Sequence, residues 1–361
     1  MILSMEIPVE DIVQRQDLCY IDLRSPGEHR QASIPGSFNI PLFNDREREE
    51  LGVIYHNQGS FPARMRGLEI GSRKLPELAG DILSVSRDKL PLLYCWRGGL
   101  RSEAVYENLK MAGINCLRLQ GGYRSFRRFI NRTLQNYHIR PRLVVLHGLT
   151  GTGKTLLLNV MASRYQPVLD LEGLACHRGS VFGKIGIKRE RSQKDFEAML
   201  WWQLENMQKS PFILVEGEGR RIGNLFLPDF LRQAMQEGIH LLVTAPLEVR
   251  AGRIALEYTS NPLSGEEKEQ FYRAIKLLSR KLGKEKTEYL LECIKREDYF
   301  EAALYLCKEY YDHYYEDARP GKQFFEETID ATCLEEGASQ LARFLDYYFH
   351  HNKPCCQKEV V

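Results

Sequence analysis

The sequence predicts an α/β protein with two parallel-sheet domains, followed by a helical C-terminal extension. The chain has 361 residues, which is more than one hydrophobic core usually supports, so two domains are expected. In each half, short apolar segments alternate with segments of helical periodicity, which is the pattern of a parallel-sheet domain. From about residue 265 to residue 350 the pattern is helical.

These patterns also suggest domain boundaries. We expect the first domain at residues 1–130 and a basic linker at 131–142. The second domain is expected at 143–260, and the helical extension at 261–351. The polar tail at 352–361 is expected to be disordered.

Composition narrows the class of protein. The contents of 43% hydrophobic and 27% charged residues are typical of a globular protein. No apolar run reaches the roughly 18 residues of a membrane span, and the first residues lack the features of a secretory signal. We therefore expect a cytoplasmic protein without a membrane partner. The nine cysteines show neither C-x-x-C pairs nor zinc-like spacing, so no disulfide framework and no structural metal are expected.

The first half contains three apolar segments with the character of strands. They lie at residues 19–24, 90–94 and 116–119, and each is followed by a turn or a loop. The second of them ends directly at Cys95, and a helix is expected after Ser102. This half is thus expected to form a small parallel-sheet domain.

Cys95 is the chemically notable residue of this half. It leaves the carboxyl end of a strand and enters a glycine-rich loop that opens a helix. The backbone N–H groups of such a loop, together with the helix N-terminus, favour an anion, and Arg97 and Arg101 add positive charge. Such surroundings favour the thiolate form of a cysteine. We interpret Cys95 as a nucleophile, with Arg97 and Arg101 as catalytic partners, in preference to a buried structural cysteine.

The second half begins with a phosphate-binding motif. An expected strand at 142–147 is followed by Gly148-Leu149-Thr150-Gly151-Thr152-Gly153-Lys154-Thr155 and a helix, which is the P-loop pattern in its proper context. The glycines Gly148, Gly151 and Gly153 allow backbone N–H groups to wrap a phosphate. Lys154 is expected to reach the terminal phosphates and Thr155 to bind Mg²⁺.

Two further features accompany this motif. The strand expected at 212–215 ends at Glu216, which we predict to hold Mg²⁺ or its water, with Glu218 close behind. A solvated strand-end carboxylate is the alternative. The glycine-punctuated segment 169–183 carries His177, Arg178 and Ser180, and we interpret it as a ligand-facing loop, with a plain surface connection as the alternative.

The net charge of +2 means that any affinity for nucleic acid must come from local basic patches. The sequence contains two, formed by Arg124, Arg127, Arg128, Arg132, Arg140 and Arg142, and by Arg178, Lys184, Lys188, Arg189, Arg191 and Lys194. Tyrosines interleave with basic residues between 305 and 319. They could stack on bases, although at helical spacing a place in the core is favoured.

The first half resembles a rhodanese domain, in which a cysteine carries sulfur or selenium. The resemblance rests on Asp22-Leu23-Arg24, on Glu28, on the segment 34–41 (Ile-Pro-Gly-Ser-Phe-Asn-Ile-Pro) and on the Cys95 loop. The spacing from Cys95 to Arg101 also matches dual-specificity phosphatases. Those enzymes usually have histidine before the cysteine, whereas this chain has Tyr94.

Nearly the whole chain resembles the selenophosphate-dependent tRNA 2-selenouridine synthases. The stretches that carry this resemblance are Pro41-Leu42-Phe43-Asn44-Asp45, Tyr94 through Ser102, Gly121-Gly122-Tyr123-Arg124, Gly148 through Thr155, and His177-Arg178-Gly179-Ser180 with Phe182-Gly183. The run Cys-Trp-Arg-Gly-Gly from Cys95 is far more specific than a generic rhodanese loop.

The resemblance implies a reaction on tRNA. Sulfur in the wobble 2-thiouridine would first be alkylated by geranyl diphosphate, giving S-geranyl-2-thiouridine. Selenium from selenophosphate would then displace geranylthiol and yield 2-selenouridine. The P-loop would hold the diphosphate, Cys95 would carry or deliver the selenium, and tRNA and a selenophosphate-producing enzyme would be partners.

Two other functions stay open on the residues. One is a rhodanese-fused P-loop kinase, ATPase or sulfurtransferase. The other is a tRNA-binding or sulfur-sensing module without activity, which the intact Cys95 loop and the intact P-loop disfavour.

Overall fold

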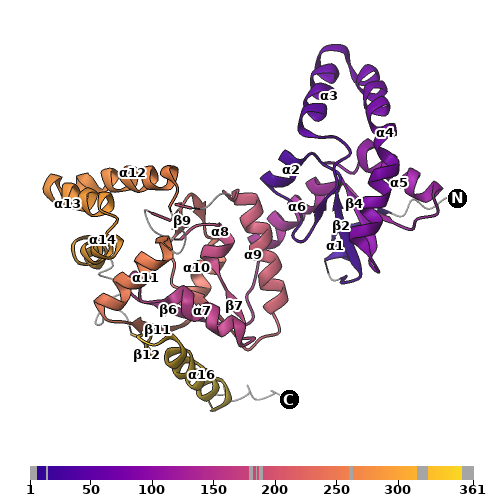
Figure 1. Ribbon diagram of the computed structural model, residues 1–361. Helices are drawn as coiled ribbons and strands as arrows, with labels where there is room; N and C mark the ends of the chain where they lie inside the picture. The colour runs from indigo at the N-terminus through magenta and orange to yellow at the C-terminus, as the bar shows by residue number, and fades with distance from the viewer. Residues whose placement is uncertain are drawn as a thin grey trace, which may run out of the picture. The chain divides into compact units, whose positions relative to one another are not determined.

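The computed structural model describes residues 6–13, 15–178, 182–183, 185–186, 190–259, 263–314 and 324–351. The chain forms two compact units (Figure 1). The N-terminal unit comprises Met1–Tyr137 and Arg191–Trp202, and the C-terminal unit comprises His138–Glu190 and Gln203–Val361. The return of residues 191–202 to the first unit is not expected from the sequence pattern.

The N-terminal unit contains a five-stranded parallel sheet in the order β1-β5-β4-β2-β3. Its strands are β1 (Glu6–Ile7), β2 (Leu18–Asp22), β3 (Phe38–Asn39), β4 (Leu90–Tyr94) and β5 (Leu117–Leu119). All five residues of β2 are buried, as is usual for a parallel strand that helices cover on both faces.

Alternate residues of β2 pack into two separate cores, because successive side chains of a strand point to opposite faces. Leu18 and Tyr20 join the core beneath α1 (Val9–Ile12), α6 (Gly122–Gln135) and α9 (Gln193–Met207). Cys19 and Ile21 join the core beneath α4 (Ser60–Ser86) and α5 (Leu100–Met111). A short helix, α2 (Pro26–Gln31), follows β2.

A pair of helices occupies the stretch between β3 and β4, where the sequence analysis assigned no element. α3 (Asp45–Gln58) and α4 pack against each other and are joined at Gly59, whose φ is +93°. The buried core residues of α4, Leu78 and Ile82, lie in its C-terminal part, and Leu51 of α3 and Ile70 of α4 pack against the same core with partial burial. The other part of the pair therefore extends beyond the sheet (Figure 1).

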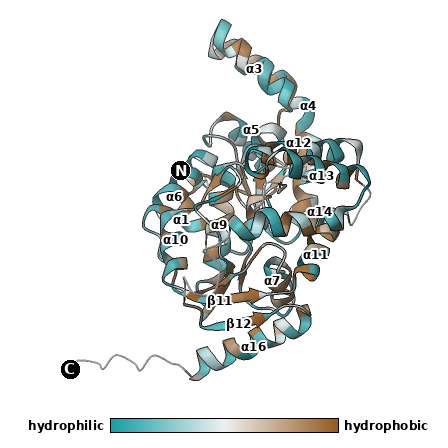
Figure 2. Ribbon diagram, turned by 90° about the vertical axis from the view of Figure 1, so that its left-hand side faces the viewer, coloured by the Kyte–Doolittle hydropathy of each residue, from teal (hydrophilic) through white to brown (hydrophobic). Residues whose placement is uncertain are grey.

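The C-terminal unit contains a second five-stranded parallel sheet in the order β12-β11-β6-β8-β7. Its strands are β6 (Arg142–His147), β7 (Val168–Leu169), β8 (Phe212–Glu216), β11 (Ile239–Thr244) and β12 (Glu327–Asp330). In Figure 2, β11 is drawn mainly in the brown of hydrophobic residues, consistent with its position between β12 and β6. The predicted fold class of two parallel-sheet α/β domains is confirmed.

Helices flank this sheet and position its loops. They are α7 (Lys154–Ser163), α8 (Leu171–Ala175), α10 (Asp229–Gln236), α11 (Leu247–Thr259) and α16 (Leu334–His351). A short hairpin of β9 (Arg221–Ile222) and β10 (Leu225–Phe226) follows β8.

The C-terminal extension is mostly helical, as predicted, but not throughout. The extension begins with α12 (Gly265–Leu282), α13 (Lys284–Lys295), α14 (Tyr299–Leu306), a π-helical turn η1 (Cys307–Tyr311) and α15 (Asp312–Tyr314). Side chains of α12, α13, α14 and η1 form a core together with α11, and Tyr310 and Tyr311 are buried in it. The chain then returns to the sheet as β12 and α16. The expected helical extension at 261–351 is therefore interrupted by β12. The sequence does not reveal this strand, because only Ile329 of β12 is buried in the core and the strand leaves no apolar pattern.

The expected linker at 131–142 and the expected tail at 352–361 can also be compared with the structure. α6 runs to Gln135 and β6 begins at Arg142, so the first part of the expected linker at 131–142 is helical. The tail at 352–361 lies outside the described residues. Within the described residues, no helix combines the length and the apolar character that a bilayer crossing requires.

Candidate functional sites

The thiol of Cys95 lies at the start of a helix. The residue follows β4 directly and its exposure is 3%. Its Sγ lies 3.3 Å from Ser102 Oγ and 3.8 Å from the carbonyl oxygen of Gly99, the N-cap residue of α5. The sulfur therefore lies within the first turn of α5, where a helix favours negative charge.

A second glycine turn holds the Cys95 loop in shape. The N–H groups of Tyr123 and Arg124 donate to the carbonyl oxygens of Cys95 and Trp96, at 2.8 and 2.9 Å. Gly122 has a φ of +58°, and a Cβ atom there would lie 2.3 Å from the Cys95 carbonyl oxygen. The two backbones thus touch at a place where a side chain cannot fit.

The two arginines that sequence analysis placed beside Cys95 differ in their surroundings. Arg101 donates to both carboxylate oxygens of Glu28, at 2.7 and 3.3 Å. Burial raises the pKa of Glu28, but hydrogen bonds from Arg101 outweigh this and hold that pKa below its usual value. Arg97 is exposed. The positive charge of Arg101 is therefore largely matched by Glu28, which the sequence analysis did not anticipate.

Arg24 supports this loop, although sequence analysis gave it no role in the site. It is 1% exposed and donates to Asp22 and to the carbonyl oxygen of Ala32. Its guanidinium lies 4.1 Å from the centre of the Tyr123 ring, which in turn packs against Trp96. The motif Asp22-Leu23-Arg24 was the available signal, and its function here is to hold the aromatic residues around the loop.

The P-loop of the C-terminal unit connects β6 to α7. Lys154 opens α7, and its Nζ donates to the carbonyl oxygen of Gly148 at 3.1 Å. Gly148, Gly151 and Gly153 have φ values of +152°, +82° and +94°, which only glycine adopts readily. The loop therefore has the backbone geometry for which its glycines were predicted.

Two arginines of α11 fix the outer side of the P-loop. Arg250 Nε donates to the carbonyl oxygen of Thr150 at 2.9 Å, and Arg253 Nη1 donates to that of Thr152 at 2.7 Å. Arg250 also pairs with Asp312. Because buried carbonyl groups need donors, these arginines stabilise the loop. They lie about a hundred residues further along the chain, and no sequence motif indicated them.

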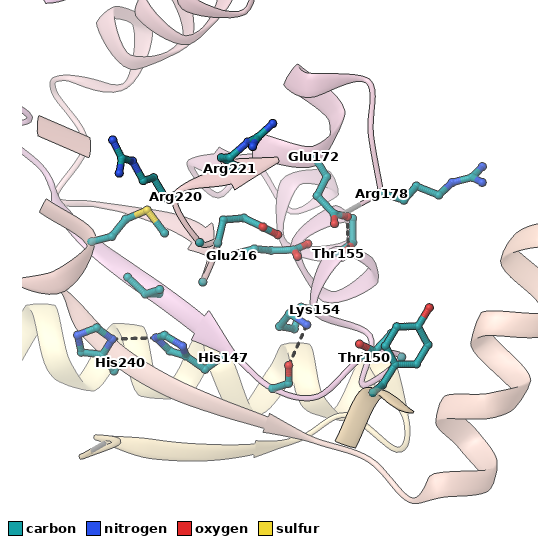
Figure 3. Close-up of a pocket in the computed structure, with 18 of the residues that line it drawn as sticks. His147, Thr150, Lys154, Thr155, Glu172, Arg178, Glu216, Arg220, Arg221 and His240 are labelled. Carbon is teal, nitrogen blue, oxygen red and sulfur yellow. Dashed lines mark hydrogen bonds between the residues drawn. The ribbon is translucent and has the colours of Figure 1, made fainter. Parts of the chain in front are cut away.

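The P-loop opens into a cavity of about 710 Å³ (Figure 3). The predicted residues that line it are Gly148, Gly151, Lys154, Thr155, Arg178, Glu216 and Glu218. His177 lies instead against Gly223 of the β9–β10 turn, and Ser180 lies outside the described residues. Arg178 pairs with Glu257 at 3.1 Å. The cavity also receives Arg220, Arg221 and Arg232, so cationic side chains surround its mouth.

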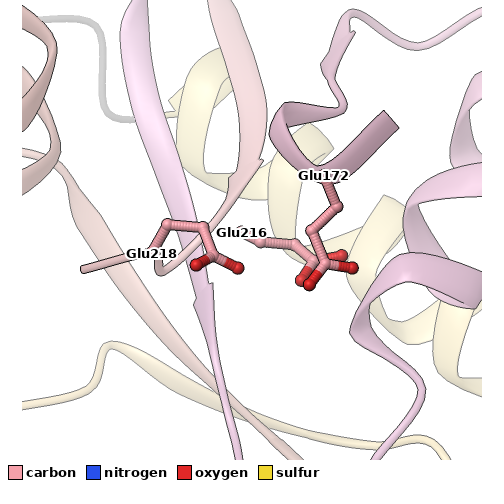
Figure 4. Close-up of side chains that lie close together, drawn as sticks. All are labelled: Glu172, Glu216 and Glu218. Atoms are coloured by element: carbon pink, nitrogen blue, oxygen red, sulfur yellow. The ribbon is translucent and has the colours of Figure 1, made fainter. Parts of the chain in front are cut away.

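Three carboxylates meet beside the P-loop. Oxygen atoms of Glu172, Glu216 and Glu218 lie within 4.8 Å of one another (Figure 4). Glu216 and Glu218 were predicted, whereas Glu172 was not. It is placed here by α8, which begins after its N-cap residue Asp170, and no spacing in the sequence reveals that proximity.

The carboxylates are poorly accommodated without a counter-charge. Burial raises the pKa of Glu172 to about 9, with contributions from the charges of Glu216 and Glu218. Burial and the Glu216 charge likewise raise the pKa of Glu218 to about 7. Oε1 of Glu216 is buried without a hydrogen-bond partner among the described residues. With Thr155 Oγ1 at 3.5 Å from Glu172, these oxygen ligands fit a hard divalent cation such as Mg²⁺.

A histidine pair forms one wall of the cavity. Nε2 of His147 lies 2.9 Å from Nδ1 of His240. Burial, followed by the proximity of His240 and Lys154, lowers the pKa of His147 to about 4. His147 is therefore neutral at pH 7 and contributes hydrogen bonding to the cavity, without adding charge to it.

The two sites define a protein that joins a rhodanese-like cysteine domain to a P-loop domain. A family model described as a rhodanese-like domain matches residues 9–128. A model described as the tRNA 2-selenouridine synthase AAA domain matches residues 141–329, just over half of the chain. The chain belongs to the tRNA 2-selenouridine synthase family, which confirms the resemblance found in the sequence.

Individual relatives agree with this assignment. The chain is 36% identical to a tRNA 2-selenouridine synthase of Nitrosomonas europaea over 67% of its own length and 64% of the relative. It is 38% identical to the enzyme of that name from Serratia proteamaculans, over 67% of this chain and 65% of the relative. The identity to the one from Pseudomonas syringae pv. tomato is 34%, over 76% of this chain and 78% of the relative. The matched region thus spans slightly less than two thirds of the first two relatives.

Replacing Gly122 by alanine should destabilise the N-terminal unit. Gly122→Ala adds a clash with the Cys95 carbonyl oxygen to the cost of a left-handed alanine, so we expect the free energy of unfolding to fall by at least about 3 kcal/mol. Gly36→Ala is the control, because Gly36 has a φ of +75° and nothing within 4 Å of its Cβ position. It should cost only about 1 kcal/mol. Urea unfolding followed by tryptophan fluorescence reports on this unit, since all three tryptophans belong to it. Equal losses would contradict the proposed clash.

The carboxylate cluster should make the C-terminal unit less stable at high pH. Glu172 has a pKa of 4.5 when unperturbed and about 9 here, so between these values the folded chain holds a proton that the unfolded chain has lost. The free energy of unfolding should therefore fall as pH rises, by about 1.4 kcal/mol per pH unit for one such group.

This dependence can be measured by hydrogen exchange of β8 amides at pH 6 and pH 8, corrected for intrinsic rates, with a chelator present. Glu172→Gln should flatten the dependence, whereas Glu248→Gln, an exposed position in the same unit, should leave it unchanged. Adding Mg²⁺ should stabilise the wild type more at pH 8 than at pH 6, because ionised carboxylates bind it. If the stability of the wild type, measured by this exchange, is the same at pH 6 and pH 8, the predicted strain in the carboxylate cluster is refuted.

Proposed function

We propose that this chain replaces the sulfur of wobble 2-thiouridine in tRNA by selenium, through S-geranyl-2-thiouridine, with geranyl diphosphate and selenophosphate as co-substrates. The observation that carries the proposal is the presence, in one chain of this family, of a cysteine at a helix N-terminus and of a P-loop cavity with a carboxylate cluster. Because tRNA is the substrate, we infer a cytoplasmic location.

The C-terminal unit is proposed to perform the alkylation. The sulfur of 2-thiouridine forms a bond to the first carbon of the geranyl group, the carbon–oxygen bond to diphosphate breaks, and the diphosphate leaves with the electron pair. Lys154 and the P-loop amides stabilise that negative charge. Thr155, Glu172, Glu216 and Glu218 would hold Mg²⁺, which when bound supplies further positive charge to the diphosphate.

The N-terminal unit is proposed to perform the selenium exchange. The selenium of selenophosphate, delivered at Cys95 with Arg97 and Arg101 near the loop, forms a bond to C2 of the base, and the carbon–sulfur bond breaks, so geranylthiolate departs with the electron pair. Water then cleaves the selenium–phosphorus bond and phosphate leaves, so selenium stays at the oxidation level of selenide throughout. The earlier alkylation matters because it converts a poor leaving group into a thiolate.

Recognition of tRNA is proposed to use arginines that are not already paired. Arg127 and Arg132 of α6 form ion pairs with Glu197 and Glu10. Arg124 and Arg128 on the same helix are exposed and, among the described residues, form no ion pair. We infer that these two are available to phosphates. An enzyme that produces selenophosphate is the further partner that we propose.

A P-loop kinase or ATPase is the second candidate, because a P-loop recognises phosphates irrespective of the group attached to them. It predicts a strict requirement for ATP. We expect no ATP requirement for the selenium exchange, and an assay with and without ATP separates the two functions.

Single substitutions should separate the two steps. With thiolated tRNA, geranyl diphosphate and selenophosphate, Cys95→Ala should accumulate geranylated uridine and form at least about 100-fold less 2-selenouridine. Lys154→Ala should reduce both products, and supplying geranylated tRNA should restore its selenouridine. Nucleoside mass spectrometry measures both. Cys116→Ala is the control, since burial raises the pKa of that thiol to about 11 and leaves it inert. Absence of both products from the wild type would overturn the proposed function.

Unpaired arginines should dominate the salt dependence of tRNA binding. Arg128→Gln should reduce the slope of log affinity against log salt by about 0.7–0.9 if it contacts one phosphate. Arg132→Gln, whose guanidinium already pairs with Glu10, should change the slope less. Filter binding across a salt series provides the measurement. A larger effect of Arg132→Gln would argue against this placement of the tRNA.

A further inference from the structure

The N-terminal unit contains a second large cavity, which the proposed function leaves unused. It is a groove of about 770 Å³ between the α3–α4 pair and α5. Its lining is mainly apolar and includes Leu51 and Tyr55 of α3, Phe61, Met65 and Leu68 of α4, and Leu100 of α5. We call it the hairpin groove.

The apolar side chains of the groove are unusually exposed. Phe61 is 72% exposed, Met65 51% and Leu68 63%. They follow one another at intervals of four and three residues, so they form one face of α4. A contiguous exposed apolar surface of this kind marks a binding site more often than a plain surface.

The groove adjoins the Cys95 loop through the first turn of α5. Leu100, Ala104 and Asn108 line the groove and are spaced four residues apart, so they share one face of the helix. Ser102 lies on the same turn but is buried on another face, where its Oγ contacts Cys95 Sγ. Leu100 and Arg101 directly follow the Cys95 loop and also line the groove, so a ligand in the groove would adjoin that loop.

Positive charge borders the apolar lining. Arg48 and Arg64 both line the groove and are exposed. Within the described residues, neither guanidinium takes part in an ion pair or a hydrogen bond. The surface therefore suits a ligand that combines a hydrocarbon chain with nearby anionic groups, which fits an alkylated nucleotide within RNA better than an apolar face of a protein.

We propose that the hairpin groove binds the alkyl chain of the S-alkylated uridine while selenium exchange takes place at Cys95, with neighbouring RNA phosphates at Arg48 and Arg64. This inference rests on the proposed function, because it takes the alkylated nucleoside as the substrate of the N-terminal unit. It assigns to α3 and α4 the selection of alkylated over unalkylated tRNA.

Competition binding of two RNA stem-loops to the full chain tests the proposal. One carries S-geranyl-2-thiouridine and the other S-methyl-2-thiouridine at the same position. The wild type should prefer the geranyl RNA by about tenfold or more, since the longer chain buries more apolar surface. Phe61→Gln with Leu68→Gln should remove most of that preference. Leu83→Gln with Met111→Gln, two exposed apolar positions outside the groove, should retain it.

The outcomes separate the groove from the proposed function. If the wild type makes 2-selenouridine but Phe61→Gln with Leu68→Gln keeps the full preference, the groove is not the alkyl site and the proposed function stands. If the wild type makes no 2-selenouridine, yet Phe61→Gln with Leu68→Gln loses the preference for the geranyl RNA, the groove is the alkyl site and the proposed reaction is wrong. A wild type without preference overturns the inference. The inference is also overturned if Phe61→Gln with Leu68→Gln changes the oligomeric state, measured by sedimentation, and keeps the preference. The groove would then be a self-association surface.

Discussion

The structure depends on how two glycine loops satisfy their own backbones. A loop that offers N–H groups to an anion leaves carbonyl oxygens that need other donors. Arginines meet this need in both units: Arg118 donates to the Gly98 carbonyl oxygen at 2.9 Å, and Arg250 and Arg253 donate to those of Thr150 and Thr152. Glycines permit the loop conformations, and arginines from elsewhere in the fold keep them. Each site thus requires its whole unit to be folded.

Charge is distributed differently in the two sites. Around the Cys95 loop, the buried Arg24 pairs with Asp22, and Arg101 pairs with Glu28, so both of these positive charges are matched by a carboxylate. The P-loop cavity instead contains clusters of both signs, with Lys154 and several arginines opposite three carboxylates. Such a cavity suits a phosphorylated ligand that arrives with a divalent cation, because each cluster then faces a partner of opposite charge.

The sequence revealed those parts of the fold that local pattern encodes. Strands that run into glycine loops were detected in both halves, as was Glu216, since these features need only neighbouring residues. Glu172, Arg24 and Arg250 were missed as site residues because their roles arise from contacts between distant segments. The strand β12 escaped detection because it buries a single side chain. The α3–α4 pair was missed because α3 buries no residue and α4 exposes Phe61, Met65 and Leu68, so neither helix has the apolar pattern of one buried face. His177 was chosen from its loop, but it packs against Gly223 and does not line the cavity.

The burial of Cys95 has a consequence for its chemical survival. Reactive thiolates are also the thiols that peroxide oxidises first, through sulfenic to irreversible sulfonic acid, and exposure is the other determinant of that damage. Cys333 is exposed, whereas Cys95 is 3% exposed beneath its glycine loop. Bulky maleimides would therefore modify Cys333 well before the proposed nucleophile. The glycine loop thus shields the Cys95 thiol from oxidants that reach the exposed Cys333.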